Sequence, residues 1–456
     1  MRHHPLPPGP TRWNAFKTVP RLLENPIRYL RQMHSIYGDV AYVRLLTRPA
    51  YYVQDPELVE DILVRNARAY SKDILLRELK PLMGDGLLTS EGSFWRRQRK
   101  LASPFLARRQ IELYADDMRR LAADYVQVLQ EKRDVDIHRE MTALTLAIVN
   151  KTLFGSDLSA NPSRVGHNLD VVMDYFYRVS RSLRRYIPTW VPTRDNRNAA
   201  NAIAELDSVV FAIIDQRHAE GASGNDLLSR LLAVRDEDGT RMSNSQVRDE
   251  VITLFLAGHE TTALALSNTL WLLSEHTDVE AKLLDEVRSL QDGFSLEALE
   301  SLSFLDAVLK ESMRLYPPAW SVAREAKETT QLGPYRVPRG TQLYMSQYLM
   351  HRDARLFDAP ETFRPERWLD GSCQALSRFA YFPFGGGPRV CIGNHFALME
   401  LKTVLVTLLR ALRFRHRPGH RVSFTPSVTM RPNNGMPMEV ISRASQKPDR
   451  DRMPAS

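Results

Sequence analysis

The sequence lacks the features that mark disulfide-rich, repetitive or multi-domain proteins. Two cysteines, Cys373 and Cys391, among 456 residues are too few for a disulfide framework and favour a reducing cytosol. No Gly/Ser linker, low-complexity run or repeat of fixed period divides the chain. We therefore expect one domain over residues 1–456, with a proline-rich segment, 1–24, and a polar tail, 441–456, outside its core.

A membrane-spanning segment is also missing from the sequence. The first ten residues, MRHHPLPPGP, contain no apolar stretch typical of a signal peptide. The most apolar segment, Val251–Ser274, is interrupted by polar residues such as His259 and Asn268, which favours a buried helix over a membrane span. The sequence thus predicts a soluble, cytoplasmic protein without a transmembrane anchor.

Basic residues exceed acidic ones, and this excess limits the kinds of partner. The net charge is +8, from 62 Lys and Arg against 54 Asp and Glu, which suits a nucleic acid, an acidic lipid surface or an acidic protein. No nucleic-acid-binding module is visible, and no aromatic residues alternate with the basic clusters. We expect no nucleic acid as a partner.

Hydrophobic periodicity predicts a mainly α fold with small peripheral β-sheets. Helical patterns dominate from about Trp95 to Tyr316. The longest of them, Ser243–His276, begins with a capping box made by Ser243 and Gln246. The other expected elements are a hairpin of Val40–Leu45 with Tyr51–Val53, a helix over Pro56–Asn66, and short strands within Gln331–Val337, Gln342–Tyr344 and Val422–Val440.

A cysteine lies in a glycine-rich loop, Phe384–Gly393, just before a helical pattern over Asn394–Leu412. Glycines allow the backbone to approach a flat cofactor closely, and a helix N-terminus favours negative charge on sulfur. Cys391 is therefore a candidate thiolate ligand to a metal. The alternative is a buried structural cysteine, since free cysteine is among the most buried residue types.

The middle of the long helix contains Ala257-Gly258-His259-Glu260-Thr261-Thr262. Glycine and adjacent threonines are poor helix formers, and a threonine hydroxyl can bond to a backbone carbonyl and distort the helix locally. An acid beside an alcohol at such a point could hold water and pass protons. The alternative is a solvated glutamate next to a threonine of the core.

These segments resemble the cytochromes P450, in particular the soluble, bacterial type of haem-thiolate monooxygenase. The resemblance covers roughly Asn25–Val440, with the motifs in the expected order. It implies the cytochrome P450 fold, with haem b held between the long central helix and the helix after the cysteine loop. It also implies that Cys391 is the axial ligand of the haem iron, where a thiolate favours cleavage of the O–O bond.

The resemblance assigns roles to further residues. Glu260 and Thr261 would deliver protons to bound O2, in a pocket lined by Ala257 and Gly258. The residues placed around the haem and its propionates are Trp95, Arg99, Arg324, Phe384, Gly385 and Arg389. A buried structural triad would consist of Glu311, Arg314 and, in the segment Pro365-Glu366-Arg367-Trp368, Arg367. From spacing alone, Glu311 and Arg314 could equally form a surface ion pair of little value.

A redox partner is also implied, because the sequence has no flavin-binding or cysteine-rich segment of its own. Electrons derived from NAD(P)H would come from a separate ferredoxin- or flavodoxin-type reductase system, and we expect a monomer. The candidate docking patch is Arg96, Arg97, Lys100, Arg108 and Arg109. The alternative is that these side chains form an ordinary solvated basic face.

The sequence restricts the substrate only to a class. The segments expected around the pocket are Leu75–Leu88, Asp170–Trp190, Phe255–Leu256, Ala319–Val322 and the turn at Thr429. Their composition favours a lipophilic molecule, fatty-acyl or terpenoid, and the resemblance implies its hydroxylation or epoxidation. Arg181, Arg184 and Arg185 are candidate carboxylate anchors, and the alternative is that they are exposed surface residues. The alternative functions are a haem-thiolate isomerase or peroxygenase, which often lacks the acid–alcohol pair, and a non-catalytic haem sensor, which would need a distal residue at the sixth position.

Overall fold

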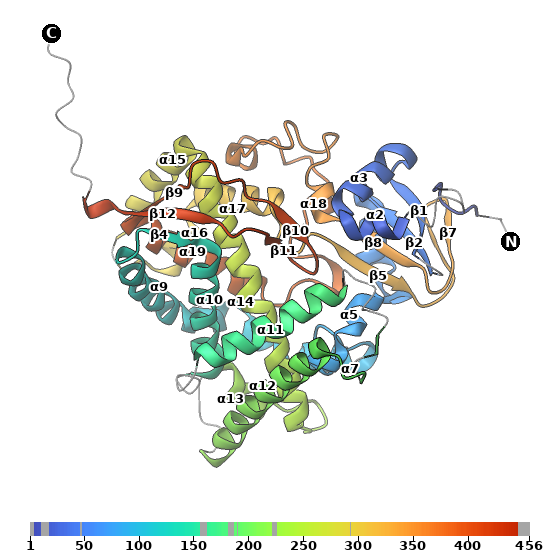
Figure 1. Cartoon of the computed structure of the whole chain (residues 1–456), viewed down its shortest axis with the longest axis horizontal. Helices are drawn as coiled ribbons and strands as arrows, with labels where there is room; N and C mark the ends of the chain where they lie inside the picture. Colours follow the sequence, from blue (N-terminus) through green and yellow to red (C-terminus); the bar gives the residue numbers. More distant parts are fainter. Residues whose placement is uncertain are drawn as a thin grey trace, which may run out of the picture.

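Helices make up most of the structure, and small sheets lie beside them (Figure 1). The computed structural model describes residues 4–10, 18–45, 48–155, 162–180, 187–188, 190–220, 226–291 and 293–445. In Figure 1 the largest sheet and the N-terminal helices lie at one end, and the long helices occupy the rest. This arrangement confirms the mainly α fold with peripheral β-sheets.

The helices fall into a long set and a short set. The long ones are α3 (Pro26–Tyr37), α7 (Gly92–Ala102), α9 (Ala115–Gln130), α10 (Ile137–Phe154), α11 (Pro162–Ser180), α12 (Arg194–Ala219), α14 (Asn244–Glu275), α15 (Thr277–Arg288), α17 (Ser303–Leu315) and α19 (Asn394–Ala411). The short ones are α2 (Thr18–Glu24), α4 (Pro56–Glu60), α5 (Ile74–Glu78), α6 (Lys80–Met83), α8 (Arg108–Ile111), α13 (Leu227–Ala233), α16 (Leu296–Glu300) and α18 (Gln347–Met350).

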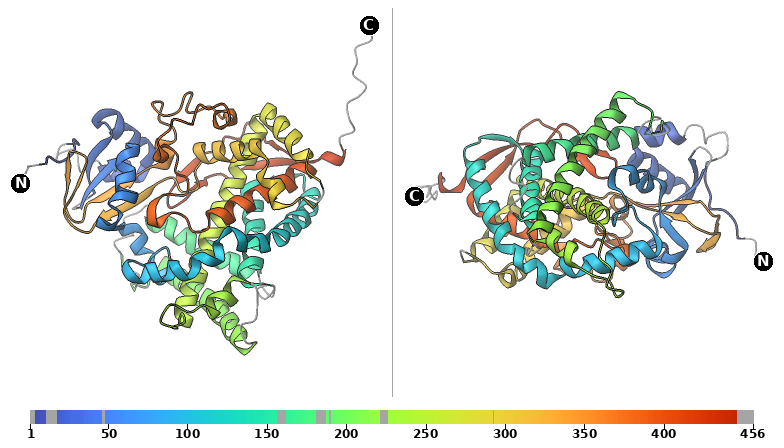
Figure 2. Two further views of the ribbon diagram at one scale, coloured as in Figure 1. Left: turned by 180° about the vertical axis from the view of Figure 1, so that it is seen from behind. Right: turned by 90° about the horizontal axis from the view of Figure 1, so that it is seen from below.

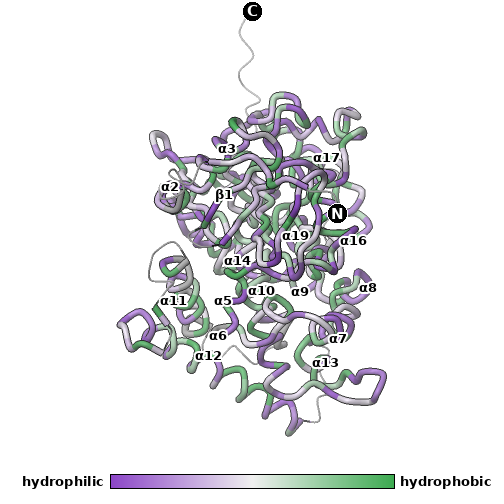
Figure 3. Tube along the Cα trace, turned by 90° about the vertical axis from the view of Figure 1, so that its right-hand side faces the viewer, coloured by the Kyte–Doolittle hydropathy of each residue, from purple (hydrophilic) through white to green (hydrophobic). Residues whose placement is uncertain are grey.

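Helix α14 runs through the middle of the molecule and is buried along most of its length. The predicted capping box is present: the Ser243 side chain accepts from the Gln246 N–H, and the Gln246 side chain accepts from the Ser243 N–H. Helices α10, α17 and α19 pack against α14. Hydrophobic segments gather where α10, α14 and α19 meet (Figure 3), and α19 runs beside α9 at the back of the molecule (Figure 2). Because α14 is enclosed on several sides, apolar residues predominate around its middle, and the few polar side chains there are buried as well.

The strands form four small sheets among the described residues. The largest has the order β1 (Val40–Leu45), β2 (Arg48–Val53), β8 (Gln342–Met345), β5 (Val322–Ala326) and β3 (Tyr70–Lys72). The β2–β8 pair is parallel and the other pairs are antiparallel. The remaining sheets are β4 (Asp134–Asp136) with β12 (Pro437–Ser442) and β9 (Leu412–His416), β6 (Thr330–Leu332) with β7 (Tyr335–Val337), and β10 (Phe424–Pro426) with β11 (Met430–Pro432).

Local predictions are confirmed where the sequence signal is strong. The hairpin of β1 and β2 is present, although β2 begins at Arg48 and the neighbouring Thr47 lies outside the described residues. The helix predicted over Pro56–Asn66 is α4 followed by a π-helical segment, Asp61–Arg65. The short strands β3, β4 and β9 were not predicted, because three to five residues carry too little periodicity.

Both segments expected outside the core form hydrogen bonds with the rest of the fold. The N–H groups of Tyr42 and Arg336 donate to the carbonyls of Pro8 at 2.7 Å and Pro5 at 3.0 Å. At the other end β12 continues to Ser442, and Arg443 Nε donates to the carbonyl of Leu409 at 2.8 Å. Residues 446–456 lie outside the described part of the chain. No helix within the described ranges is both long and apolar enough to cross a membrane.

Candidate active site

A cavity of about 870 Å³ lies between α14 and the cysteine loop with its following helix, α19. Its volume is within the range of roughly 300–1,000 Å³ that is typical of small-molecule sites. We call the part of the cavity next to the cysteine loop its inner end. It is lined by Ala257, Thr261, Thr262 and Ala265 of α14, and by Phe384, Gly385, Cys391, Ala397 and Leu401 of the loop and α19. The sequence prediction that a cofactor site lies between these two helices is consistent with this cavity.

The cysteine loop has the backbone that a close approach to a flat group requires. The N–H of Cys391 donates to the carbonyl of Phe384 at 2.9 Å and closes the loop. Gly385 lines the cavity with φ +71°, and no atom lies within 4 Å of where its Cβ would stand. Gly387 has φ +66°, and a Cβ there would meet the carbonyl oxygen of Leu63 at 1.8 Å. The left-handed conformations and the tight contact explain why this loop needs glycine.

Cys391 is exposed to the cavity but lies deep inside the protein, and its surroundings shift the pKa of its thiol in opposite directions. Burial raises the pKa of the Cys391 thiol, while the N–H of Gly393 and the charge of Arg99 lower it. Metal coordination deprotonates such a thiol outright. The second cysteine, Cys373, does not line the cavity, and burial raises its pKa as well.

Side chains predicted to hold propionates gather on one wall of this cavity. Trp95, Arg99, Arg324 and Arg389 all line it, although they come from α7, β5 and the cysteine loop. The Arg389 guanidinium lies 3.7 Å from the centroid of the Trp95 ring. Its Nη1 donates to the carbonyl of Ser90 at 3.1 Å. The structure therefore brings together four of the six residues that the resemblance places around the cofactor, and the other two, Phe384 and Gly385, line the same cavity.

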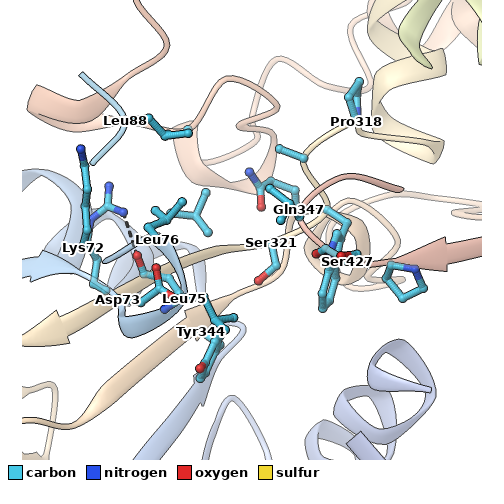
Figure 4. A pocket seen from close by; sticks show the side chains of 18 of the residues that line it. Lys72, Asp73, Leu75, Leu76, Leu88, Pro318, Ser321, Tyr344, Gln347 and Ser427 are labelled. Carbon is cyan, nitrogen blue, oxygen red and sulfur yellow. Dashed lines mark hydrogen bonds between the residues drawn. The ribbon is translucent and has the colours of Figure 1, made fainter. Parts of the chain in front are cut away.

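Lys72 is a fifth residue of this wall, and sequence reasoning missed it. Its Nζ donates to the carbonyls of Leu87 at 2.6 Å and Ser90 at 3.1 Å. Burial, followed by the charge of Arg389, lowers the pKa of Lys72 to about 7. Figure 4 shows Lys72 beside Asp73 on one side of the cavity. A lysine in the three-residue strand β3 has no pattern that marks it as buried.

The charges on this wall fit an anionic group. The pKa values of Lys72, Arg99, Arg324 and Arg389 are all lowered, and burial is the largest cause in each case; for Arg389 the value falls to about 10. Buried cations with lowered pKa values are stabilised when an anion binds next to them. The two propionates of haem are such anions, so the residues present fit the cofactor that the resemblance implies.

The two residues predicted to line an oxygen pocket point in different directions. Ala257 lines the cavity, and its carbonyl accepts from Thr261 Oγ1 at 2.7 Å, the kind of hydroxyl–carbonyl bond expected at this point. Gly258 does not line the cavity. A Cβ at Gly258 would face Val149 of α10 at 3.3 Å. Successive helical residues point about 100° apart, so Gly258 allows close packing of α10 on α14.

Glu260 also points away from the cavity, whereas Thr261 lines it. Glu260 Oε1 accepts a hydrogen bond from Thr429 Oγ1 at 2.6 Å and forms an ion pair with Arg431 Nε. Burial alone would raise the pKa of Glu260, but the hydrogen bond and charge of Arg431 lower it below its ordinary value. The acid and the alcohol are thus neighbours in sequence but face different surroundings, and sequence reasoning missed Arg431.

His259 is buried and does not line the cavity. Its Nδ1 lies 2.9 Å from the carbonyl oxygen of Phe255, four residues earlier in α14. The sequence predicts that His259 points aside, and this geometry agrees. The side chain is therefore not placed to occupy the sixth coordination position of a haem iron, as the sensor hypothesis would need.

The predicted structural triad is assembled and fully buried. Arg314 donates to both carboxylate oxygens of Glu311, at 2.8 and 2.9 Å. Arg367 Nε donates to Oε1 of Glu311 at 2.9 Å, and Trp368 Nε1 donates to Oε2 at 2.9 Å. Burial alone would raise the pKa of Glu311, but the hydrogen bond and charge of Arg314 lower it. Because the triad is buried, the surface-pair alternative is wrong.

The outer part of the cavity has a wall that sequence reasoning predicted only in part. Residues within 75–88 and 319–322 line it as predicted, and the hairpin turn lines it through 426–428 instead of Thr429. Phe255 and Leu256 are buried elsewhere, and no described residue of 170–190 lines the cavity. Arg181, Arg184 and Arg185 lie outside the described residues.

The N-terminal region forms a second, unpredicted part of this wall. Its lining residues are Leu22, Pro26, Tyr29, Leu30, Val43, Leu45, Arg48 and Tyr52. Figure 4 shows Leu75 and Leu76 on one side of the cavity, with Pro318 and Ser427 on the other. The cavity therefore reaches from Cys391 to the N-terminal helices and sheet, and most of its lining is apolar.

The basic residues of α7 and its exit do not form a free positive patch. Three of the five have carboxylate partners: Arg97 with Asp236 at 2.7 Å, Lys100 with Glu237, and Arg108 with Glu300. No carboxylate among the described residues pairs with Arg96 or Arg109, and both side chains are exposed. The positive charge available to a partner is therefore smaller than the sequence predicts.

Comparison with known proteins places the chain in a family. The family model described as "Cytochrome P450" matches residues 7–437, so the resemblance begins before the predicted Asn25. Cyclooctatin synthase of Streptomyces melanosporofaciens is 34% identical over 415 residues, which are 90% of each chain. Pentalenene oxygenase of Streptomyces avermitilis is 32% identical over 405 residues, 87% of this chain and 89% of the relative.

A solved structure supports the same placement. The cyanobacterial CYP120A1 with bound retinoic acid matches this structure with a TM-score of 0.86 and 25% identity, covering 97% of this chain and 100% of the other. Cyclooctat-9-en-7-ol 5-monooxygenase of Streptomyces melanosporofaciens is 34% identical over 87% of each chain. The chain therefore belongs to the cytochrome P450 family and is a haem-thiolate monooxygenase.

Proposed function

We propose that this monooxygenase inserts one oxygen atom of O2 into a terpenoid substrate, by hydroxylation or epoxidation, with electrons from a separate redox protein. The observation that carries the proposal is that one continuous cavity connects Cys391 and Thr261 with the apolar wall at the N-terminal helices. A substrate seated in its outer part would present one end to the reaction centre.

Haem b is the cofactor that the family implies, and we assign its contacts to named residues. Cys391 would be the axial ligand, and Lys72, Trp95, Arg99, Arg324 and Arg389 would surround the propionates. Phe384 and Gly385 would lie against the ring. When bound, haem supplies the iron at which O2 is reduced and activated, with a thiolate that favours O–O cleavage.

Thr261 is the proposed hydrogen-bonding group for bound oxygen. Because its hydroxyl proton is donated to the carbonyl of Ala257, its oxygen lone pairs are free to accept a hydrogen bond on the cavity side. Glu260 is the proposed source of protons for Thr261. An ionised carboxylate only accepts hydrogen bonds, so Glu260 must first take a proton from water and turn toward Thr261.

The choice of a terpenoid rests on two kinds of support. The apolar lining favours a lipophilic molecule over a sugar, nucleotide or amino acid. Among the relatives, two Streptomyces enzymes are named for the oxidation of cyclooctat-9-en-7-ol and pentalenene, and the structural neighbour holds retinoic acid. A fatty-acyl substrate is the second candidate, because it has the same apolar character.

The electron donor is proposed to be a ferredoxin- or flavodoxin-type protein served by a NAD(P)H-dependent reductase. The sequence has no flavin-binding motif or iron–sulfur ligand set that would let the chain reduce itself. A net charge of +8 favours an acidic partner.

A binding and turnover experiment tests the proposal. The purified haem-loaded protein is titrated with cyclic diterpenes, sesquiterpenes, retinoic acid and fatty acids, and the substrate-induced spin shift of the Soret band is recorded. The best binder is then turned over under ¹⁸O2 with a surrogate reductase chain. We expect the largest shift with a terpenoid and one ¹⁸O atom per product molecule.

Other outcomes have distinct meanings. Strong shifts with fatty acids alone would replace the terpenoid by the fatty-acyl class. Product that forms only with added peroxide, and carries no oxygen from O2, would favour a peroxygenase. No product and no spin shift from any class would contradict the proposed substrate range.

A further inference from the structure

Arg431 has a position that no sequence motif predicts. It lies in β11, and the hairpin that joins β10 to β11 lines the cavity through residues 426–428. Strands β10 and β11 pair from Phe424 with Pro432 to Pro426 with Met430. The N–H of Met430 also donates to the carbonyl of Pro318, a second cavity residue, at 3.0 Å. The backbone of Arg431 is thus fixed to the wall that faces the substrate.

The Arg431 side chain connects the interior with the surface. Its Nε pairs with Oε1 of Glu260, and its Nη1 lies 3.5 Å from Oδ1 of Asp174 on α11. The exposed fractions of the three side chains are 4% for Glu260, 21% for Arg431 and 65% for Asp174. One guanidinium therefore bridges a buried carboxylate of α14 and an exposed carboxylate of α11.

Only one of the two carboxylate oxygens of Glu260 has hydrogen-bond partners among the described residues. Oε1 accepts from both Thr429 and Arg431, whereas Oε2 is buried and has no hydrogen-bond partner among the described residues. A buried polar atom without a hydrogen-bond partner costs about 1–3 kcal/mol. A rotation of the Glu260 carboxylate that brings Oε2 to water or a hydroxyl would therefore be favourable. The contacts of Oε1 with Thr429 and Arg431 are what oppose that turn.

Other charged and titratable groups near Glu260 come from three elements. His138 of α10, His259 of α14 and Asp136 before α10 lie around the pair. Burial, followed by the charge of Arg431, lowers the pKa of His138 to about 4, so His138 is neutral at physiological pH. Arg431 is therefore the main positive charge that faces the Glu260 carboxylate.

We propose that Arg431 is a positioning residue for proton delivery: its ion pair with Glu260 keeps that side chain turned away from the cavity. Asp174 is a second carboxylate with which Arg431 can pair, and Glu260 is released when Arg431 moves to Asp174. The inference rests on the proposed role of Glu260. In the cycle, Arg431 shifts toward Asp174 and Glu260 takes one proton from water. Glu260 then gives this proton to the Thr261 oxygen as the Thr261 hydroxyl turns from the carbonyl of Ala257 and its own proton passes to the bound ligand. The carboxylate returns to Arg431, so one proton is delivered and no side chain is consumed.

The test measures the protonation of Glu260 directly. In the haem-loaded protein, the infrared C=O band of protonated Glu260 is identified by its loss in Glu260→Gln and titrated against pH. In Arg431→Gln the titration should move up by about 1–3 pH units, because removing an adjacent opposite charge raises the pKa of a carboxyl. In Asp174→Asn it should move down, because one negative charge is lost and Arg431 stays on Glu260. Asp215→Asn, an exposed acid on α12, is the matched control and should leave the titration unchanged.

Turnover gives the second measurement. Product formed per NAD(P)H should fall in both Arg431→Gln and Asp174→Asn, and Arg431→Lys should restore part of the loss seen in Arg431→Gln. Peroxide-driven turnover, which bypasses reduction of O2, should remain at the wild-type rate. If Arg431→Gln fails to fold, Asp174→Asn and Arg431→Lys carry the test.

Each negative result would overturn a different part of the proposal. A wild-type infrared titration in Arg431→Gln overturns the positioning role. If Arg431→Gln does not fold, a wild-type titration in Asp174→Asn overturns it. A shifted titration together with unchanged coupling in both Arg431→Gln and Glu260→Gln overturns the role of Glu260 in proton delivery, and with it the use proposed for Arg431. Shifts in the same direction for Arg431→Gln and Asp174→Asn overturn the idea that Asp174 competes for the guanidinium.

Discussion

Arg99 Nη2 donates to the carbonyl of Val390 at 2.8 Å. Val390 immediately precedes Cys391, so this bond ties α7 to the cysteine loop, which is far away in sequence. Burial lowers the pKa of Arg99, and the nearby Cys391 opposes that effect. The position and charge of the sulfur therefore depend on a helix from the first quarter of the chain. This relationship explains why a ligand loop with the right local sequence also needs the rest of the fold.

The first prediction concerns the axial ligand. Cys391→Ser should abolish the red-shifted Soret band of the ferrous carbonyl complex, because a serine oxygen cannot replace the electron donation of a thiolate. Cys373→Ser is the matched control and should keep the band, since Cys373 does not line the cavity. A thiolate-type spectrum that persists in Cys391→Ser would remove Cys391 from the iron.

The second prediction concerns Thr261. Thr261→Ala should still bind O2 but release more of it as peroxide, because the hydroxyl that faces the cavity is lost while the groups proposed to hold haem remain. Proton-transfer groups contribute typically about 10²–10⁴-fold, and the measurement is product formed per NAD(P)H consumed. Thr261→Ser keeps a hydroxyl and should be close to wild type. Equal coupling in Thr261→Ala and wild type would mean that Thr261 takes no part in proton delivery.

Local chemistry in the sequence predicted much of the candidate site. The capping box of Ser243 and Gln246 set the start of α14, and the glycines before Cys391 identified a loop that only glycine can form. These features depend on residues within a few positions of one another. The resemblance supplied the remaining contacts that meet across the fold, such as Arg367 with Glu311.

The parts that sequence reasoning missed depend on long-range contacts. Arg431 and Lys72 are single basic residues in three-residue strands, and only tertiary packing makes them partners of the site. The orientation of the Glu260 side chain could not be predicted either. Helical spacing shows that Glu260 adjoins Thr261, but it does not show which side chains Glu260 contacts. Similarly, the three-residue strands β3 and β4 are stabilised by pairing partners hundreds of residues away.

The third prediction concerns the buried triad. Glu311→Gln should destabilise the protein by about 3–5 kcal/mol, because it leaves the buried charges of Arg314 and Arg367 without their counter-charge. Thermal unfolding measures the loss. Glu366→Gln is the matched control: Glu366 pairs with Lys282 at the surface, and such exposed pairs contribute little to stability.

The pH dependence of stability gives an independent check on the triad. The folded-state pKa of Glu311 lies below its unfolded value, so its stabilisation is fully present above about pH 4.3 and is lost as the pH falls through the folded pKa. Glu311→Gln should therefore be less stable at neutral pH and should lose less stability than wild type on acidification. A similar acid loss in both proteins would show that Glu311 is not held ionised by Arg314.

The fourth prediction concerns the docking surface for the electron donor. Arg96 and Arg109 are the exposed members of the basic set without an internal carboxylate partner among the described residues, so they carry the charge that a partner can contact. Reversing both to Glu should slow reduction by an acidic ferredoxin. The difference from wild type should shrink as salt rises, since the Debye length is only about 8 Å at physiological ionic strength. Peroxide-driven turnover should be unchanged.

A pair of substitutions that raises the positive charge beside α7 tests the same docking surface in the opposite direction. Arg97 and Lys100 are poor sites for charge reversal, because such changes also break their ion pairs with Asp236 and Glu237. Replacing Asp236 by Asn and Glu237 by Gln instead releases both cations and raises the local positive charge. If α7 is the docking surface, this variant should be reduced faster than wild type at low salt, while the Arg96 and Arg109 reversals are reduced more slowly. If reduction responds to neither change, the donor binds elsewhere and the basic residues of α7 form only a solvated face.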